Sequence, residues 1–174
     1  YVWIANAGQR ERGLDLVVSG VQRIPASSVD PRAKNYHWND LTMGLLGALD
    51  AGGDTVVLTD GAGHVVEGPG FNVFCVNAQG VLVTPAQGVL EGITRRTVIE
   101  MAQAAGLPLQ VRALPAAELR AAREVFLSSS AGGVLRRLMP SGTGGRPKVC
   151  CKRSSLRAMA SAPSLLKPMR LISA

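Results

Sequence analysis

Short runs of apolar residues, each bounded by glycine, proline, asparagine or aspartate, recur through the first half of the chain. Residues 14–22 carry many β-branched side chains in partial alternation, which predicts a strand. Further short runs, separated by turn residues such as Asp60-Gly61, predict strands at residues 55–59, 64–67, 72–76 and 81–84. Because the connections between these four strands are short, we expect them to form an antiparallel meander.

A helical period appears in two other segments. Apolar residues recur at helical spacing over residues 41–49, and Gly52 ends the pattern. A second amphipathic helix starts at Ile93 and is closed by Gly106. The remaining pattern predicts a strand at 109–114, a short helix at 115–122 and a last strand at 125–128. Together these elements predict an α+β fold.

The net charge of +7 is unevenly distributed along the chain. Residues 1–134 hold 10 basic and 12 acidic residues, whereas residues 135–174 hold 9 basic residues and no acidic residue. The body of the chain, residues 1–134, is therefore nearly neutral, which argues against nucleic-acid binding. No periodicity continues past Val134, so we expect residues 135–174 to be a basic tail that is disordered or the product of a frameshift.

The sequence also bears on location. No apolar run reaches the roughly 18 residues of a membrane span, and no signal peptide opens the chain. We therefore expect a cytoplasmic protein that does not bind membranes.

Lys34 is the only lysine among residues 1–134, where nine arginines supply the rest of the positive charge. Arginine stays protonated in proteins, whereas a lysine amine can lose its proton in a desolvated site and act as a nucleophile. Most lysines are nevertheless solvated surface charges. A reactive Lys34 therefore requires supporting groups elsewhere in the chain.

A lysine that forms a Schiff base with pyridoxal phosphate needs three such groups. The pyridine nitrogen needs a carboxylate, for which Glu67 is a candidate because it ends a predicted strand before a glycine-rich turn. The phosphate needs an anion site, which the helix start at Gly92-Ile93-Thr94 offers through its free N–H groups. The small-residue loop Ser128–Gly133 offers hydroxyls as a second candidate. The ring needs an apolar wall, for which Leu90 is the candidate. Taken singly, Glu67 is most simply a solvated carboxylate and Thr94 a helix cap.

Several blocks of sequence occur here in a recognisable order and spacing over about residues 20–134. They read Asp30-Pro31-Arg32-Ala33-Lys34-Asn35-Tyr36, Leu58-Thr59-Asp60-Gly61, Val66-Glu67-Gly68-Pro69-Gly70-Phe71-Asn72-Val73-Phe74, Val89-Leu90-Glu91-Gly92-Ile93-Thr94-Arg95 and Ala121-Ala122-Arg123-Glu124-Val125-Phe126-Leu127-Ser128-Ser129-Ser130-Ala131. As a set they resemble the class IV aminotransferases. These are pyridoxal-phosphate enzymes of fold type IV and include branched-chain and D-amino-acid aminotransferases.

The resemblance implies a fold and a set of residue roles. Residues 1–134 would form the large, cofactor-binding domain, an antiparallel meander with packed helices, and the family's small N-terminal domain would lie before Tyr1. Lys34 would form the Schiff base and move a proton between substrate and cofactor, with Glu67 at the pyridine nitrogen. The other residues implied at the cofactor are Tyr36, Leu90, Gly92, Ile93, Thr94 and Ser130, and no metal is implied.

The implied activity is transamination between an amino acid of the branched-chain type, or a primary amine, and a 2-oxo acid, in a homodimer. Residues 34–41 are most similar to the branch that contains (R)-selective amine transaminases. D-amino-acid aminotransferase and aminodeoxychorismate lyase are alternatives within the family. The alternative outside it is a non-catalytic remnant, or a binding module whose basic tail binds nucleic acid.

Some positions depart from the family's pattern. Ser130 stands where a threonine is usual, although its hydroxyl can still donate a hydrogen bond. After Val134, the residues Leu135-Arg136-Arg137 replace the usual proline and the later Gly-Pro segment, so we expect the large domain to lack its final helix. His37 and His64 are isolated histidines, which we expect to be structural or exposed rather than catalytic.

Overall fold

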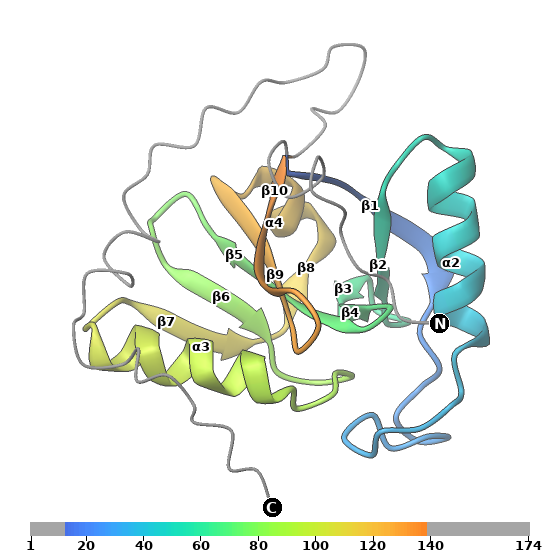
Figure 1. Cartoon of the computed structure of the whole chain (residues 1–174), viewed down its shortest axis with the longest axis horizontal. Helices are drawn as coiled ribbons and strands as arrows, with labels where there is room; N and C mark the ends of the chain where they lie inside the picture. Colours follow the sequence, from blue (N-terminus) through green and yellow to red (C-terminus); the bar gives the residue numbers. More distant parts are fainter. Residues whose placement is uncertain (1–12, 139–174) are drawn as a thin grey trace, which may run out of the picture.

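The computed structural model describes residues 13–138 (Figure 1), so the first residues and the predicted tail from 139 onward lie outside the described part. The strands are β1 (Leu14–Gln22), β2 (Thr55–Thr59), β3 (His64–Val65), β4 (Glu67–Gly68), β5 (Phe71–Val76), β6 (Leu82–Pro85), β7 (Leu109–Arg112), β8 (Leu114–Pro115), β9 (Glu124–Ser129) and β10 (Gly133–Leu138). The helices are α2 (Asn39–Asp50), α3 (Ile93–Ala104) and α4 (Ala116–Ala121). The predicted α+β character and all three predicted helices are present.

The strands form one strongly curved sheet. Neighbouring strands follow the order β7-β6-β5-β9-β10-β1-β2-β3-β8, and β4 pairs with β5. β1 is parallel to both β2 and β10, and β6 is parallel to β7. A single residue, Ala113, separates β7 from β8 at the two ends of this order. The two ends therefore lie close together, which means that the sheet curves round on itself.

Alternate residues of the central strands pack into different clusters. In β5, Val73 and Cys75 belong to a central cluster shared with β1, β2 and β9, whereas Phe74 and Val76 pack against α3. β2 divides its side chains in the same way between the central cluster and α2. Figure 1 shows α2 beside β1 and β2, and α3 beside β6 and β7. Because both faces are covered, these strands read as continuous apolar runs rather than as alternating ones.

The predicted meander is only partly correct. β2 and β3 are antiparallel neighbours, as are β5 and β6, but β3 ends at Val65 and takes β8 as its second neighbour. The short strand β4 pairs with β5 instead. The predicted strand 109–114 likewise divides at Ala113, so that its first part joins β6 and its end joins β3. Local periodicity indicates which segments are extended but does not determine which strands pair with one another.

The expectation that regular structure ends at Val134 is wrong for the next four residues. β10 continues to Leu138 and pairs with β9 on one side and with β1 on the other. Backbone hydrogen bonds from two flanking strands hold a segment extended without requiring a regular pattern of side chains. The composition of residues 135–138 therefore did not reveal this strand.

Candidate active site

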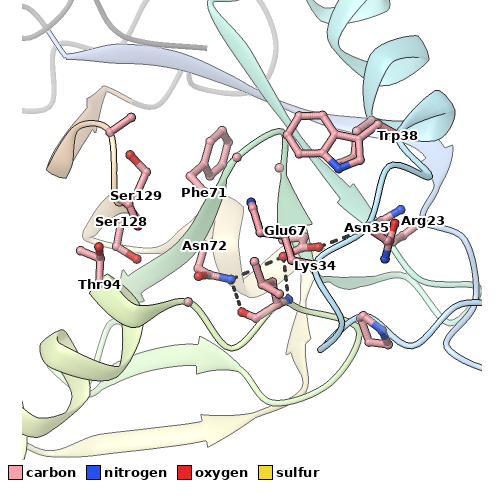
Figure 2. Close-up of a pocket in the computed structure, with 18 of the residues that line it drawn as sticks. Arg23, Lys34, Asn35, Trp38, Glu67, Phe71, Asn72, Thr94, Ser128 and Ser129 are labelled. Atoms are coloured by element: carbon pink, nitrogen blue, oxygen red, sulfur yellow. Dashed lines mark hydrogen bonds and ion pairs between the residues drawn. The ribbon is translucent and has the colours of Figure 1, made fainter. Parts of the chain in front are cut away.

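A cavity of about 310 Å³ opens where the segment between β1 and α2 meets the β4–β5 turn, the start of α3 and the end of β9. Figure 2 shows the side chains that line it. The lining residues are Arg23, Pro31, Ala33, Lys34, Asn35, Trp38, Leu41, Glu67, Gly68, Gly70, Phe71, Asn72, Leu90, Gly92, Thr94, Ser128, Ser129, Ser130 and Ala131. The cavity thus combines residues that are more than 100 positions apart in the sequence. Its volume is at the lower end of the range for small-molecule sites.

Lys34 lies on the cavity in a segment without helix or strand, and its side chain is exposed. Local hydrogen bonds hold the backbone on either side of it. The Asn35 side chain donates to the Ala33 carbonyl at 2.8 Å and accepts the His37 N–H at 2.9 Å. Figure 2 shows the Lys34 side chain entering the space near Glu67, Phe71 and Trp38. The amine is therefore accessible and lies in the same cavity as the Glu67 carboxylate.

Glu67 is a buried carboxylate in β4, with 7% of its surface exposed. Its Oε2 accepts the Leu90 N–H at 2.8 Å, and the Asn72 amide nitrogen lies 3.5 Å from the same oxygen. Burial raises the pKa of Glu67 above its ordinary value, while the Leu90 hydrogen bond and the nearby Arg23 charge oppose that rise. Glu67 is thus a carboxylate with increased proton affinity at the wall of the cavity.

The start of α3 presents donors without an internal acceptor. The N-cap residue is Gly92, with no side-chain capping bond, and the first turn holds no acidic residue. The Arg96 N–H donates to the Gly92 carbonyl at 2.9 Å, so the preceding N–H groups have no acceptor within the helix. Thr94 is therefore not the cap that the simpler interpretation assumed. This helix end, with its positive dipole, suits an anionic group.

A buried hydroxyl lies beside this helix end. Ser128 is 1% exposed, lines the cavity, and its Oγ has no hydrogen-bond partner among the described residues. Figure 2 shows Ser128 near Thr94, on the strand next to Asn72. An unpartnered buried hydroxyl is costly, at about 1–3 kcal/mol, and this one lines the cavity, so Ser128 is a candidate donor to a bound ligand or water.

Gly92 permits close packing that shapes the cavity. A side chain at position 92 would overlap the Asn72 side-chain oxygen. The other end of that amide donates to the Leu90 carbonyl at 2.8 Å. Asn72 therefore fixes the loop before α3 against β5, and through this loop it orients the Leu90 N–H toward Glu67.

The structure gathers most of the predicted site residues, but not all of them. Lys34, Glu67, Leu90, Gly92, Thr94 and Ser130 line the cavity, whereas Tyr36 and Ile93 do not. Tyr36 is fully exposed, and the Ile93 side chain is 69% exposed. Trp38, two residues beyond Tyr36, is the aromatic side chain that this segment contributes to the wall. The backbone N–H of Ile93 belongs to the helix start described above.

Sequence reasoning missed Arg23 and Asn72 as site residues, and it included Ser128 only as part of the hydroxyl-bearing loop 128–133. Asn72 follows a glycine-rich turn and Ser128 opens a small-residue loop, which are weak signals that gain meaning only once the strands are paired. Arg23 shows no sequence signal beyond its place after a predicted strand. His37 and His64 do not line the cavity, and His64 Nδ1 lies 3.2 Å from Asp60 Oδ2 in a partly exposed contact.

Within residues 13–138 no helix is long and apolar enough to cross a membrane. In the same residues, no group of three or more histidine, cysteine, aspartate or glutamate side chains is gathered as a metal site.

Comparison with known proteins assigns the chain to a family. The family described as Amino-transferase class IV matches residues 3–136. The chain belongs to the class IV aminotransferases. The branched-chain-amino-acid aminotransferase of Escherichia coli (strain K12) is 33% identical over 140 residues, which are 77% of this chain and 45% of that protein. The Pseudomonas aeruginosa enzyme of the same name is 30% identical over 136 residues, 76% of this chain and 44% of the relative.

Solved structures of branched-chain aminotransferases confirm the predicted fold. The Thermoproteus uzoniensis enzyme with norvaline has a TM-score of 0.72 and 30% identity, covering 85% of this chain and 49% of its own. The Thermobaculum terrenum enzyme in its PLP form has a TM-score of 0.69 and 31% identity, and the match covers 72% of this chain and 42% of that enzyme. This chain spans less than half the length of the curated relatives it matches.

Proposed function

We propose that this class IV aminotransferase chain binds pyridoxal phosphate through Lys34. The reaction it serves is transfer of an amino group between an amino acid of the branched-chain type, or a primary amine, and a 2-oxo acid. The observation that carries the proposal is the cavity itself. It joins an accessible lysine amine, a buried carboxylate and a helix N-terminus from three separate segments.

The residues present fit the polar parts of the cofactor. The N–H groups at the start of α3, with the hydroxyls of Thr94 and Ser130, suit its phosphate. The Ser128 hydroxyl, buried without a partner among the described residues, is a further donor at the same end. Glu67 suits the ring nitrogen and Lys34 the aldehyde carbon. Leu90 and Trp38, both lining the cavity, supply the apolar surface that a flat ring requires.

Bound pyridoxal phosphate supplies an electron-withdrawing ring that stabilises negative charge on the substrate carbon next to the amino group. The residues of this chain position the reactants and move protons. The ionised Glu67 carboxylate would accept a hydrogen bond from the ring nitrogen and so keep that nitrogen protonated, and the Arg23 charge opposes the rise in pKa that burial causes. The Lys34 amine would attach the cofactor and, once released, would take a proton from the substrate carbon and deliver it to the cofactor. The helix end fixes the phosphate and with it the ring.

The names of the relatives support the branched-chain substrate class, since the E. coli and P. aeruginosa proteins are branched-chain-amino-acid aminotransferases. No observation on residues 13–138 favours the D-amino-acid, lyase or nucleic-acid-binding alternatives. The basic tail that the last of these requires begins beyond Val134 and lies mostly outside the described part. Assembly as a homodimer and a cytoplasmic location stay predictions.

Spectroscopic titration with pyridoxal phosphate tests the attachment. We expect the wild-type chain to develop an absorption band distinct from that of the free cofactor and to retain it through gel filtration. Lys34→Arg keeps the positive charge but lacks the nucleophile, so it should show no such band. An equal band in Lys34→Arg, or none in the wild type, would contradict the proposal.

Addition of an amino donor to the loaded chain tests the substrate class. We expect L-leucine to change the spectrum and D-leucine to leave it unchanged. A response to D-leucine alone would instead support the D-amino-acid alternative.

A further inference from the structure

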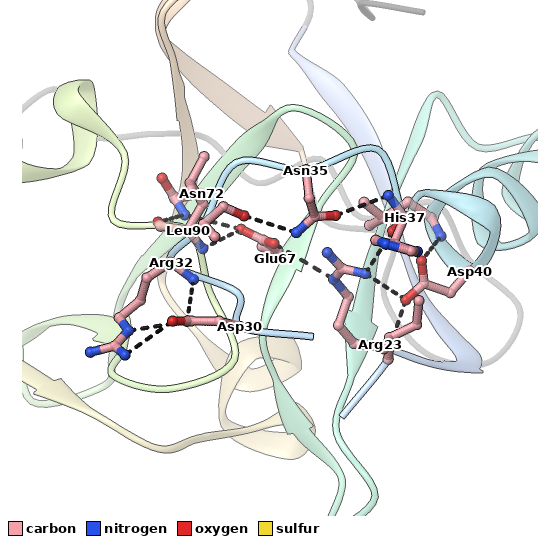
Figure 3. A network of polar contacts seen from close by, with 12 residues as sticks. Arg23, Asp30, Arg32, Asn35, His37, Asp40, Glu67, Asn72 and Leu90 are labelled. Atoms are coloured by element: carbon pink, nitrogen blue, oxygen red, sulfur yellow. Dashed lines mark hydrogen bonds and ion pairs between the residues drawn. The ribbon is translucent and has the colours of Figure 1, made fainter. Parts of the chain in front are cut away.

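Three charged side chains form a buried chain along one side of the cavity (Figure 3). Arg23 Nη1 lies 2.7 Å from Asp40 Oδ2, and Arg23 Nε lies 3.6 Å from Glu67 Oε1. The side chains of all three residues are more than nine-tenths buried. Glu67 therefore does not meet the cavity as an isolated carboxylate, because an arginine connects it to a second one.

Arg23 is shared unequally between the two carboxylates. Its contact with Asp40 is a short hydrogen bond, whereas the 3.6 Å separation from Glu67 is an ion pair beyond hydrogen-bond distance. Arg23 Nε accordingly has no hydrogen-bond partner among the described residues. Asp40 is itself fixed, since its carboxylate accepts the N–H groups of Ile24 at 2.7 Å and Leu41 at 2.8 Å. The first turn of α2 thus holds the guanidinium on the Asp40 side.

The unequal sharing has an electrostatic consequence. Two buried carboxylates and one guanidinium carry a net charge of −1 when all are ionised. The charge of Arg23 favours the ionised form of Glu67, and the charge of Asp40 disfavours it. A carboxylate fully paired with arginine would be a poor proton acceptor, whereas one held 3.6 Å away keeps part of its basicity. The remaining negative charge suits a protonated ring nitrogen.

We propose that Arg23 and Asp40 are positioning residues that set how readily Glu67 holds a proton. Arg23 keeps the carboxylate ionised, and Asp40 limits that effect by retaining the guanidinium. The meaning of this balance for a ring nitrogen rests on the proposed function. The effect on Glu67 does not, and it can be measured on the chain without cofactor. Lys34 and Arg95, the other charged groups near Glu67, stay unchanged in the test.

The two residues should act on Glu67 in opposite directions. NMR titration of the glutamate side-chain carboxyls in the cofactor-free chain, with Glu67→Gln to assign the signal, measures its pKa. We expect Arg23→Gln to raise that pKa by about 1 unit or more, a tenfold or greater gain in proton affinity. Asp40→Asn should lower it by a smaller amount. In the double variant the Asp40→Asn effect should shrink, because most of it acts through Arg23.

Arg112→Gln is a matched control. Arg112 Nη2 lies 2.6 Å from Glu118 Oε1, and neither residue lines the cavity. This substitution should move the Glu118 signal and leave that of Glu67 unchanged. If Asp40→Asn does not fold, Arg23→Lys tests whether the guanidinium acts on Glu67. The single ammonium group should stay with Asp40, so the pKa of Glu67 should lie above that of the wild type. A Glu67 pKa that is unchanged in the Arg23 variants, or that rises in Asp40→Asn, would overturn the inference. If the Glu67 pKa shifts as expected but the chain does not bind pyridoxal phosphate, only the proposed function is overturned.

Discussion

The two sides of the cavity are built in different ways. On one side, Glu67, Asn72 and Ser128 project from paired strands and are 7%, 5% and 1% exposed. On the other side, Lys34 is exposed on a segment held by short-range hydrogen bonds such as those of Asn35. The sheet thus fixes the groups that must keep their charge and direction. In the proposed function, the loop carries the amine that exchanges between cofactor and substrate.

This difference implies that substitutions on the two sides should affect different properties, namely stability on the strand side and chemistry on the loop side. A change on the strand side that overpacks the buried elements or breaks a contact between them should lower the free energy of unfolding. A change on the loop side removes chemistry while leaving the packing intact. The predictions below test this separation, beginning with the largest expected effect.

Lys34→Ala should abolish covalent retention of pyridoxal phosphate completely. Because the Lys34 side chain is exposed, the same change should leave the thermal unfolding midpoint of the cofactor-free chain unaltered. Gel filtration with absorbance detection measures the first effect, and calorimetry the second. A large fall in the unfolding midpoint would show that the loop is structurally coupled to the sheet.

Gly68→Ala should destabilise the fold by about 3 kcal/mol, since overpacking in a closed site costs that order. An added Cβ at this position would overlap the Phe71 ring and the Val56 carbonyl. Gly47→Ala in α2 is the control, because it meets open space and should stabilise the helix by about 1 kcal/mol. Urea unfolding measures both, and a Gly68→Ala chain as stable as Gly47→Ala would refute the described packing.

Ser128→Ala should separate stability from cofactor binding. Because the hydroxyl has no partner among the described residues, its removal should not lower the free energy of unfolding of the cofactor-free chain. Affinity for pyridoxal phosphate should fall about five-fold, which corresponds to one lost hydrogen bond of about 1 kcal/mol. Calorimetric titration of both chains checks the affinity, and an unchanged value would place Ser128 outside the ligand contacts.

Glu67 and Glu118 should shift stability with pH in opposite senses. Burial raises the pKa of Glu67, so the folded state holds its proton more tightly and the free energy of unfolding falls as pH rises from about 4.5 toward that raised value. The hydrogen bond from Arg112 lowers the pKa of Glu118, so its contribution is present above about pH 4.5 and is lost as pH falls through the lowered value.

Urea unfolding of Glu67→Gln and Glu118→Gln across this pH range measures the two slopes. We expect Glu67→Gln to remove the fall in the free energy of unfolding above about pH 4.5. We expect Glu118→Gln to remove the fall in that free energy at lower pH. Equal pH profiles for both variants would contradict the assignment of one glutamate to a buried site and the other to a half-exposed ion pair.

Tyr36→Ala should have the smallest effect. Its side chain is fully exposed and does not line the cavity, so stability should change by less than about 0.5 kcal/mol and cofactor retention should be unaltered. Trp38→Ala, two residues on, is the comparison: it removes a lining side chain and should weaken retention. Weaker retention in Tyr36→Ala would show that the loop has a different arrangement when the cofactor is bound.

The limits of sequence reasoning are visible in these same residues. Lys34, Glu67 and the start of α3 could be predicted to share a site because an isolated lysine, a carboxylate at a strand end and a glycine before a helix leave weak local patterns that together resemble a family. Asn72 and Ser128 are directly paired across β5 and β9, although 56 positions separate them in the sequence. No local pattern encodes that register.

The segment between β1 and α2 shows the second limit. It has no periodicity, and the resemblance implied Tyr36 at the cofactor, whereas Trp38 lines the cavity and Tyr36 is exposed. The buried contact of Arg23 with Asp40 crosses the same segment and depends on where α2 begins against β1. β10 was missed for a related reason, since its backbone bonds come from strands distant in sequence.

The most direct test of Lys34 as the cofactor lysine uses the other lysines of the chain as internal controls. Lys148, Lys152 and Lys167 are equally capable of a non-specific reaction with an aldehyde. The chain is loaded with pyridoxal phosphate, reduced with borohydride, digested and mapped by mass spectrometry. The account predicts a phosphopyridoxyl group on Lys34 at one equivalent and little on the other three lysines. An adduct spread over all four lysines, or absent from Lys34, would contradict it.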